Sequence, residues 1–205
     1  ARPEEILDAA FQVFGEQGFA RTRLEDVAHR AGVSKGTLYL YFDSKETLFR
    51  EMVRARIVPA VAEGEELLTT HEGPASELLV LLVRRMWGTV RAPEVARIGR
   101  LVQAELANFP ELARFYFDEI ILRSRRLIQA VLDRGVASGE FRAAPLNFPT
   151  RAIGSLLVHS GQQQCFFASL DPNALSDDQV VEGVIDLVLN GVLARPAPVR
   201  SKERA

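Results

Sequence analysis

Side chains that donate hydrogen bonds gather between positions 34 and 45 of the 205-residue chain. Lys35-Gly36-Thr37 is followed by Tyr39-Leu40-Tyr41, and Lys45 comes shortly afterwards. Lysine and tyrosine donate to phosphate oxygens, and threonine presents a hydroxyl and a methyl group to base edges. Gly36 lacks a side chain, so the backbone there can approach a ligand closely. These residue types at this spacing are typical of a helix that reads double-stranded DNA.

Such a helix needs a small core behind it. Leu38 and Phe42 stand four residues apart and are expected to face inward. Gly32-Val33-Ser34 separates this short helix from a preceding one that begins at Thr22, where Thr22-Arg23-Leu24-Glu25 has the capping-box pattern. Ser34 is expected to cap the short helix, which runs to about Phe42, and Ser44 or Asp43 to cap the next one. The arrangement predicts a helix-turn-helix.

Helical periodicity continues along the whole chain, and no alternating stretch indicates a strand. We expect an all-α fold of about nine helices: a three-helix helix-turn-helix domain and a larger helical domain for ligand binding and dimerisation. The predicted domains are 1–48 and 49–195, with a disordered basic tail over 196–205. Besides the short helices, the predicted helices cover 3–17, 75–91, 93–108, 110–138, 147–169 and 177–194.

Residues 20–49 resemble the DNA-binding region of the TetR family of transcriptional regulators. The family pattern has a threonine opening the second helix, an Ala-x-x-Ala-Gly-Val-Ser turn, then Gly-Thr-Leu-Tyr-x-x-Phe and Ser-Lys-Glu. The matching residues are Thr22, Ala28, 31–34, 36–39, Phe42 and 44–46. The resemblance implies DNA contacts from Thr37, Tyr39, Leu40, Tyr41 and Lys45. The family often has an aromatic residue at position 40 and histidine at 41, so Leu40 and Tyr41 depart from it in positions that bear on base preference.

The charge of the chain bears on how DNA would be bound. The net charge of the chain is −2, but the segment from Arg21 to Lys45 contains five basic residues and three acidic ones. Affinity therefore has to come from two copies and positioned contacts and not from bulk charge. The residues expected to contact DNA are Thr22, Arg23, Ser34, Lys35, Gly36, Thr37, Tyr39, Leu40, Tyr41 and Lys45.

The larger domain is rich in aromatic residues, with a few polar residues among them. A ligand cavity between helices needs apolar walls and a few polar groups, although aromatic residues on helices are also ordinary core. A histidine on an apolar helix face, as His159 is, is more often a core or interface residue than a ligand contact. Glu105 and the run from Asn108 to Ala113 are similar to a Glu…Phe-Pro-Glu-Leu signature of a TetR subgroup. The candidate cavity residues are Trp87, Gln103, Glu105, Phe109, Tyr116, His159, Gln163 and Phe166.

The last two predicted helices have the composition of an interface. Small residues along the first would allow close helix approach, and the second is apolar on most of its sides, so it must be buried on most sides. Pairing with the same helices of a second subunit as a four-helix bundle satisfies this requirement, and burial within one subunit is the alternative. The candidate interface residues are Gly154, Leu157, Ser160, Gly161, Val181, Val184, Leu187 and Val188.

The expected function is a cytoplasmic homodimeric regulator, a repressor by family default, with activation also open. A small apolar or amphipathic inducer would release it from a palindromic operator, with the helix from Leu48 to Ile57 as the lever. A ligand-independent DNA-binding or architectural protein of the same fold is the alternative. An enzyme is disfavoured because the chain has no catalytic triad, no H-E-x-x-H and no phosphate-binding glycine loop. No cofactor, metal or membrane partner is expected, and the single cysteine excludes an internal disulfide.

Overall fold

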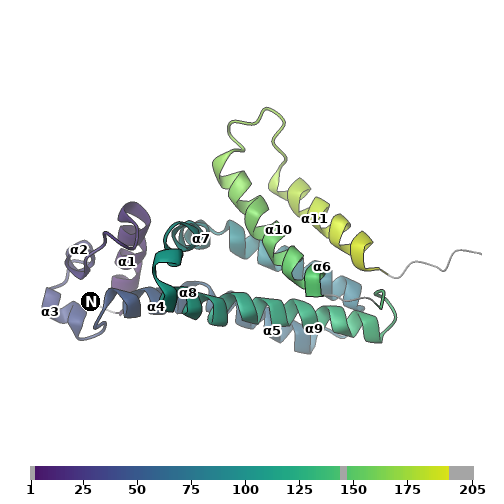
Figure 1. Cartoon of the computed structure of the whole chain (residues 1–205), viewed down its shortest axis with the longest axis horizontal. Coiled ribbons are helices and arrows are strands. Elements are labelled where there is room, and N and C mark those ends of the chain that lie inside the picture. The colour runs from purple at the N-terminus through teal and green to yellow at the C-terminus, as the bar shows by residue number, and fades with distance from the viewer. Residues whose placement is uncertain (1–2, 144–146, 194–205) are drawn as a thin grey trace, which may run out of the picture.

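The computed structural model describes residues 3–143 and 147–193. Every element in these ranges is a helix, apart from one isolated β-bridge between Phe141 and Leu193. The all-α prediction is therefore confirmed. The predicted tail over 196–205 lies outside the described residues. Figure 1 shows a small group of short helices at one end of an elongated molecule and long helices filling the rest.

The short helices are α1 (Pro3–Gln17), α2 (Leu24–Arg30) and α3 (Lys35–Tyr39), which we call the head. Gly18 and Gly32 follow the first two with φ of +79° and +67°. This left-handed conformation ends a helix and favours glycine. The Ser34 hydroxyl accepts the Thr37 N–H at 3.0 Å, which confirms the predicted cap of α3.

The predicted start of α2 at Thr22 is wrong by two residues. The carboxylate that closes this helix end belongs to Asp26, which accepts the Arg23 N–H at 3.2 Å, and not to Glu25. The Thr22 hydroxyl donates to the Gly18 carbonyl at 2.7 Å, and the residue is only 2% exposed. Thr22 thus closes the α1–α2 loop instead of capping a helix.

The helix α4 (Lys45–Arg56) begins at the predicted Ser44 cap and leads from the head into the body. It is followed by α5 (Val58–Thr70), a helix that the sequence analysis did not place. Pro59 lies in the first turn of α5, where its missing N–H has no partner to lose. Gly64 lets α5 pack closely on α9, because a Cβ there would lie 2.6 Å from Leu127 Cδ2.

The rest of the body consists of α6 (Ala75–Arg91), α7 (Pro93–Glu105), η1 (Leu106–Asn108), α8 (Pro110–Tyr116), η2 (Phe117–Leu122), α9 (Arg123–Ala137), α10 (Asn147–Phe166) and α11 (Asp177–Val192). The predicted helix 110–138 contains a π-helical turn, η2, that periodicity did not indicate. The α6 N-terminus lacks a side-chain cap of its own, since Pro74 precedes it. Glu140 accepts the N–H groups of Ala75 and Ser76 at 2.9 and 3.0 Å in its place.

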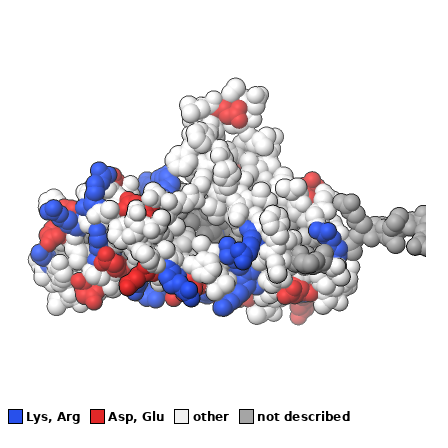
Figure 2. Space-filling model, viewed as in Figure 1, with Lys and Arg blue, Asp and Glu red and all other residues white. Residues whose placement is uncertain are grey.

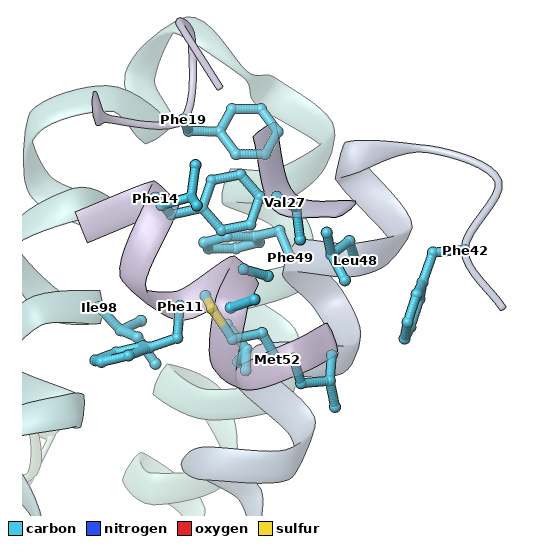
Figure 3. Close-up of a cluster of buried hydrophobic side chains, with 14 of the residues drawn as sticks. Phe11, Phe14, Phe19, Val27, Phe42, Leu48, Phe49, Met52 and Ile98 are labelled. Atoms are coloured by element: carbon cyan, nitrogen blue, oxygen red, sulfur yellow. The ribbon is translucent and has the colours of Figure 1, made fainter. Parts of the chain in front are cut away.

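Two apolar cores hold the molecule together. The body core joins α6, α9, α10 and α11. The head core joins α1 to α4 with Ile98 and Leu101 of α7, Leu112 of α8 and Ile120 of η2. The head core thus crosses the predicted boundary between residues 48 and 49. Figure 3 shows Phe14, Phe19 and Phe49 close together in it, with ring centroids 5.4 to 6.1 Å apart.

Candidate DNA-binding face and ligand cavity

The α3 helix presents its large side chains outward. Tyr39, Leu40 and Tyr41 are 44%, 82% and 47% exposed, whereas Leu38 and Phe42 are buried against the head core. This division is the one predicted from the spacing. Two tyrosines and a leucine exposed side by side on a short helix are poorly solvated, and contact with another molecule would cover them.

The N-terminal end of α3 is open and polar. A Cβ at Gly36 would meet nothing closer than 3.8 Å, so the backbone is accessible there. The Thr37 hydroxyl lies 2.8 Å from that of Ser34. The Lys35 ammonium contacts the Glu25 carboxylate and lies 5.6 Å from the Tyr39 ring centroid. This ammonium lowers the pKa of Glu25, so both groups stay charged at neutral pH.

Lys45 is oriented toward its own protein. Its ammonium donates to the carbonyls of Phe19 and Ala20 at 3.0 and 3.1 Å and lies 4.7 Å from the Phe19 ring centroid. A lysine ammonium has three donors, so one remains for a phosphate. Lys45 therefore holds the α1–α2 loop, a structural task that the sequence analysis did not anticipate.

Glu105 and Phe109 belong to the same contact and not to the cavity, which corrects their predicted placement. Glu105 accepts the Ala20 N–H at 2.6 Å, and the Phe109 ring packs edge-on to Phe19 at 4.8 Å. The last turn of α7 faces the head, and that direction explains the error. We call the group of Phe19, Ala20, Lys45, Glu105 and Phe109 the latch, because it ties the head to the body.

A cavity of about 510 Å³ lies among α5, α6, α7, η2, α9 and α10. Figure 2 shows the molecule hollowed between its helices, with basic side chains at the edge of the hollow. Four predicted residues line the cavity: Gln103, Tyr116, His159 and Phe166. Trp87 and Gln163 do not line it. Trp87 is buried in the body core, and Gln163 is exposed beside His159, 3.3 Å from its Nε2.

The cavity walls are apolar with a few polar groups. The π-helical turn η2 directs Ile120 and Ile121 into the cavity, and Tyr116 precedes it. Burial raises the pKa of Tyr116 to about 12, so its hydroxyl stays neutral and able to donate. The arginines of the lining are not among the cavity residues predicted from the sequence. The sequence pattern that could have indicated Arg151 is its spacing of four residues from Ser155 and eight from His159. This spacing places all three side chains on one face of α10.

Most of the predicted interface residues are covered by their own subunit. Leu157, Gly161, Val181, Val184 and Val188 are buried where α10 and α11 pack on each other and on α6. The close approach expected at Gly161 is made to Val90, whose Cγ1 would lie 2.5 Å from a Cβ there. The structure thus shows these five residues buried within the subunit, and their part in a contact with a second subunit stays a prediction.

The outer face of α11 is exposed instead. Leu187 is 60% exposed, and Gly183 and Gly191, one turn away on either side, are exposed as well. On α10, Ser160 is half-buried, and Gly154 lines the cavity. A contact between α11 and a partner would therefore use Leu187 and its neighbours.

None of the helices within 3–143 and 147–193 combines the length and the apolar character that crossing a membrane requires.

An exposed recognition helix on a compact head, joined to a helical body with an apolar cavity, defines a helix-turn-helix transcriptional regulator with its own ligand-binding domain. Residues 6–52 match the family model of bacterial regulatory proteins of the tetR family, and residues 77–191 match that of the AefR-like transcriptional repressor C-terminal domain. The chain belongs to the TetR family, as its sequence predicted, and is a DNA-binding transcriptional regulator.

Relatives in other organisms agree. The chain is 31% identical over 143 residues to the transcriptional repressor KstR2 of Rhodococcus jostii, covering 69% of each chain. It is 27% identical over 138 residues to the fatty acid metabolism regulator of Bacillus subtilis, covering 67% of this chain and 70% of that protein.

Solved structures share the fold. FadR from Bacillus subtilis in complex with stearoyl-CoA superposes with a TM-score of 0.77 at 21% identity, covering 93% of this chain and 99% of that one. A transcriptional regulator from Saccharomonospora viridis in complex with choline gives 0.76 at 21% identity, covering 94% and 98%.

Proposed function

We propose that a homodimer of this chain represses transcription from a palindromic operator and is released when a small apolar or amphipathic molecule enters the cavity. The observation that carries the proposal is that α4 and α7 each run from the cavity to the latch. Ile57 lines the cavity at one end of α4, and Lys45 holds the α1–α2 loop at the other. Gln103 lines the cavity two residues before Glu105 of the latch.

The two α3 helices of the dimer would enter successive major grooves about 34 Å apart. Thr37, Tyr39, Leu40 and Tyr41 would face the groove. Arg23, Ser34, Lys35, Gly36 and the free donor of Lys45 would contact phosphates. Thr22 is left out of this set, because its buried hydroxyl already donates to Gly18.

Release would follow from a change in head position. A ligand that favours a different position of α7 also favours a different position of Glu105, and with it of the α1–α2 loop. Binding of DNA and of ligand are then linked, so each weakens the other by the same factor. The relatives FadR and the Saccharomonospora viridis regulator, with stearoyl-CoA and choline bound respectively, support the view that this fold accommodates small molecules.

The test is to fill the cavity. Gly99 lies within α7 and lines the cavity, and a Cβ there would meet nothing within 4 Å. Gly99→Leu should preserve folding and operator binding but abolish release by the inducer. Gly88→Ala is the matched control, since Gly88 is also an open helical glycine but does not line the cavity.

The operator is identified by selecting the sequences that the protein binds from random DNA. Lipophilic compounds are then screened for an inducer, which lowers the fluorescence anisotropy of labelled operator DNA by releasing it from the protein. Wild type and Gly88→Ala should respond, and Gly99→Leu should not. A non-palindromic selected site would contradict the dimer. Unchanged release from Gly99→Leu, or no compound that releases wild type, would contradict the switch.

A further inference from the structure

The charged residues of the cavity lining all have the same sign. Arg85, Arg100, Arg125 and Arg151 line the cavity together with His159, and no aspartate or glutamate among the described residues does. The chain as a whole contains slightly more acidic than basic residues. The lining is therefore selectively basic and not a sample of the surface.

Three of these arginines have no carboxylate partner among the residues of 3–143 and 147–193. Nine arginines of the described ranges form ion pairs, including Arg85 with Glu63. Arg100, Arg125 and Arg151 form none with any described residue. Arg100 and Arg125 instead lie 5.5 and 5.6 Å from the ring centroids of Phe166 and Phe117. Their guanidinium donors remain available to an anion.

Two of the unpaired arginines lie at the same crossing of helices. The Thr150 hydroxyl donates to Gln129 Oε1 at 2.7 Å, which joins α10 to α9. Arg151 is the next residue after Thr150, and Arg125 lies one turn before Gln129. Ser124 and Ser155 line the cavity beside them. The α9–α10 crossing thus places two guanidinium groups and two hydroxyls in one region of the lining.

The remainder of the cavity suits a hydrocarbon chain. Its lining includes Ile57, which lies between α4 and α5, and Val61, Leu82, Val95, Ile120 and Leu157 from α5, α6, α7, η2 and α10. A volume of about 510 Å³ falls in the range of pockets that enclose a small organic ligand. The cavity therefore combines an apolar interior with basic groups at the α9–α10 crossing.

We propose that the ligand is an anionic amphiphile: its carboxylate or phosphate group binds Arg125 and Arg151, and its hydrocarbon tail fills the apolar interior. The inference rests on the proposed function, because it names the ligand class of the same cavity. A cationic amphiphile finds no carboxylate in the lining and is repelled by the arginines. A neutral one leaves the guanidinium groups without a new partner.

The test uses the whole 205-residue protein. It compares four probes that have the same hydrocarbon tail and differ in their polar group. Binding of dodecanoate, dodecanoyl-CoA, dodecanol and dodecyltrimethylammonium is measured by calorimetry, below their micelle concentrations, and release of operator DNA by anisotropy. At least one anionic probe should bind about tenfold or more tightly than dodecanol and release DNA. The cation should bind most weakly. Dodecanoate against dodecanoyl-CoA distinguishes a free carboxylate from a phosphate-bearing carrier.

The variant Arg125→Gln/Arg151→Gln should weaken binding of the anionic probe about tenfold or more and leave dodecanol unchanged. Arg126→Gln is the control, because Arg126 is exposed on the same helix but does not line the cavity. Melting curves establish that all variants are folded. Binding of dodecanol or the cation as tightly as the anions, or an unaffected double variant, overturns this inference alone. If none of the compounds releases operator DNA, the proposed function is overturned as well.

Discussion

The head and the body are built from the same kind of helix but are packed differently. The head core is filled with aromatic rings: Phe14, Phe19 and Phe49 contact one another and are at most 1% exposed. The body contains a cavity of about 510 Å³ beside its core.

The difference shows how one chain combines rigidity with adaptability. Reading a base sequence requires α3 to be held firmly, and close packing provides this. Accepting a ligand requires space, and space forgoes dispersion contacts that a filled core would make. Substitutions in the two regions should therefore have unequal effects.

The largest effect is expected for Phe49→Ala. Removing a fully buried ring from the filled head core leaves a cavity and should lower the free energy of unfolding by about 3–5 kcal/mol. Met86→Ala is the counterpart, because Met86 lines a cavity that already exists, and it should cost well under half as much. Urea denaturation of both variants measures the difference. Equal losses would contradict the contrast between a filled head and a hollow body.

A smaller effect on stability and a second effect on DNA binding are expected for Lys45→Met, which keeps the apolar stem. Loss of the two hydrogen bonds to Phe19 and Ala20 should lower the free energy of unfolding by about 1–2 kcal/mol. Operator affinity should fall as well, with a shallower salt dependence.

Lys35→Met is the control for Lys45→Met. It should reduce operator affinity without changing the melting temperature, because Lys35 is exposed and its only ion pair is with exposed Glu25. A melting temperature unchanged in Lys45→Met would remove that lysine from the latch.

Glu140→Gln should lower the free energy of unfolding by about 1 kcal/mol at pH 7, because it weakens the cap of α6 in the body. The N–H groups of Ser76 and Ala75 lower the pKa of Glu140 from 4.5 to about 2. A lowered pKa in the folded state stabilises the fold above pH 4.5, and this contribution is lost as the pH falls from 4.5 to about 2. The difference in the free energy of unfolding between wild type and Glu140→Gln, measured by urea denaturation, should therefore shrink as the pH falls over that interval. Exposed Glu77→Gln is the control, and a difference that persists at pH 2 would contradict the cap.

The smallest effect is expected for Glu25→Gln. Its exposed pair with Lys35 should contribute nothing measurable to the melting temperature. Removing the carboxylate frees the Lys35 ammonium and reduces repulsion of phosphates, so operator affinity should rise modestly and more clearly at low salt. A weaker affinity would show that Glu25 positions Lys35 for DNA.

The head could be predicted from the sequence because its signals are local. Ser34, Ser44, Gly18 and Gly32 act within three or four residues of themselves, and each ends or begins a helix as expected. The error at Thr22 is also instructive. A threonine followed by Glu25 fits a capping box, but the hydroxyl found a carbonyl in the preceding turn, which sequence spacing alone does not exclude.

The cavity could be predicted only in part, because residues from several helices converge on it. Tyr116 and His159 were placed correctly by type, since a cavity needs a few polar groups. Trp87 and Phe109 have equally suitable types but face the body core and the latch. The arginines were missed because a charged residue on a helix normally faces water, and only the packing of α9 on α10 places Arg125 and Arg151 in the lining of one cavity.

The continuity of the head core across residues 48 and 49 limits how the molecule could be re-engineered. A fragment ending near Arg56 would expose the apolar surfaces that Ile98, Leu101 and Leu112 now cover, and it would be expected to aggregate. A chimaera that transplants this DNA specificity onto another sensor would have to carry the matching surface of α7 and α8 as well. The reading module is thus a noncontiguous unit, assembled from two stretches of the chain.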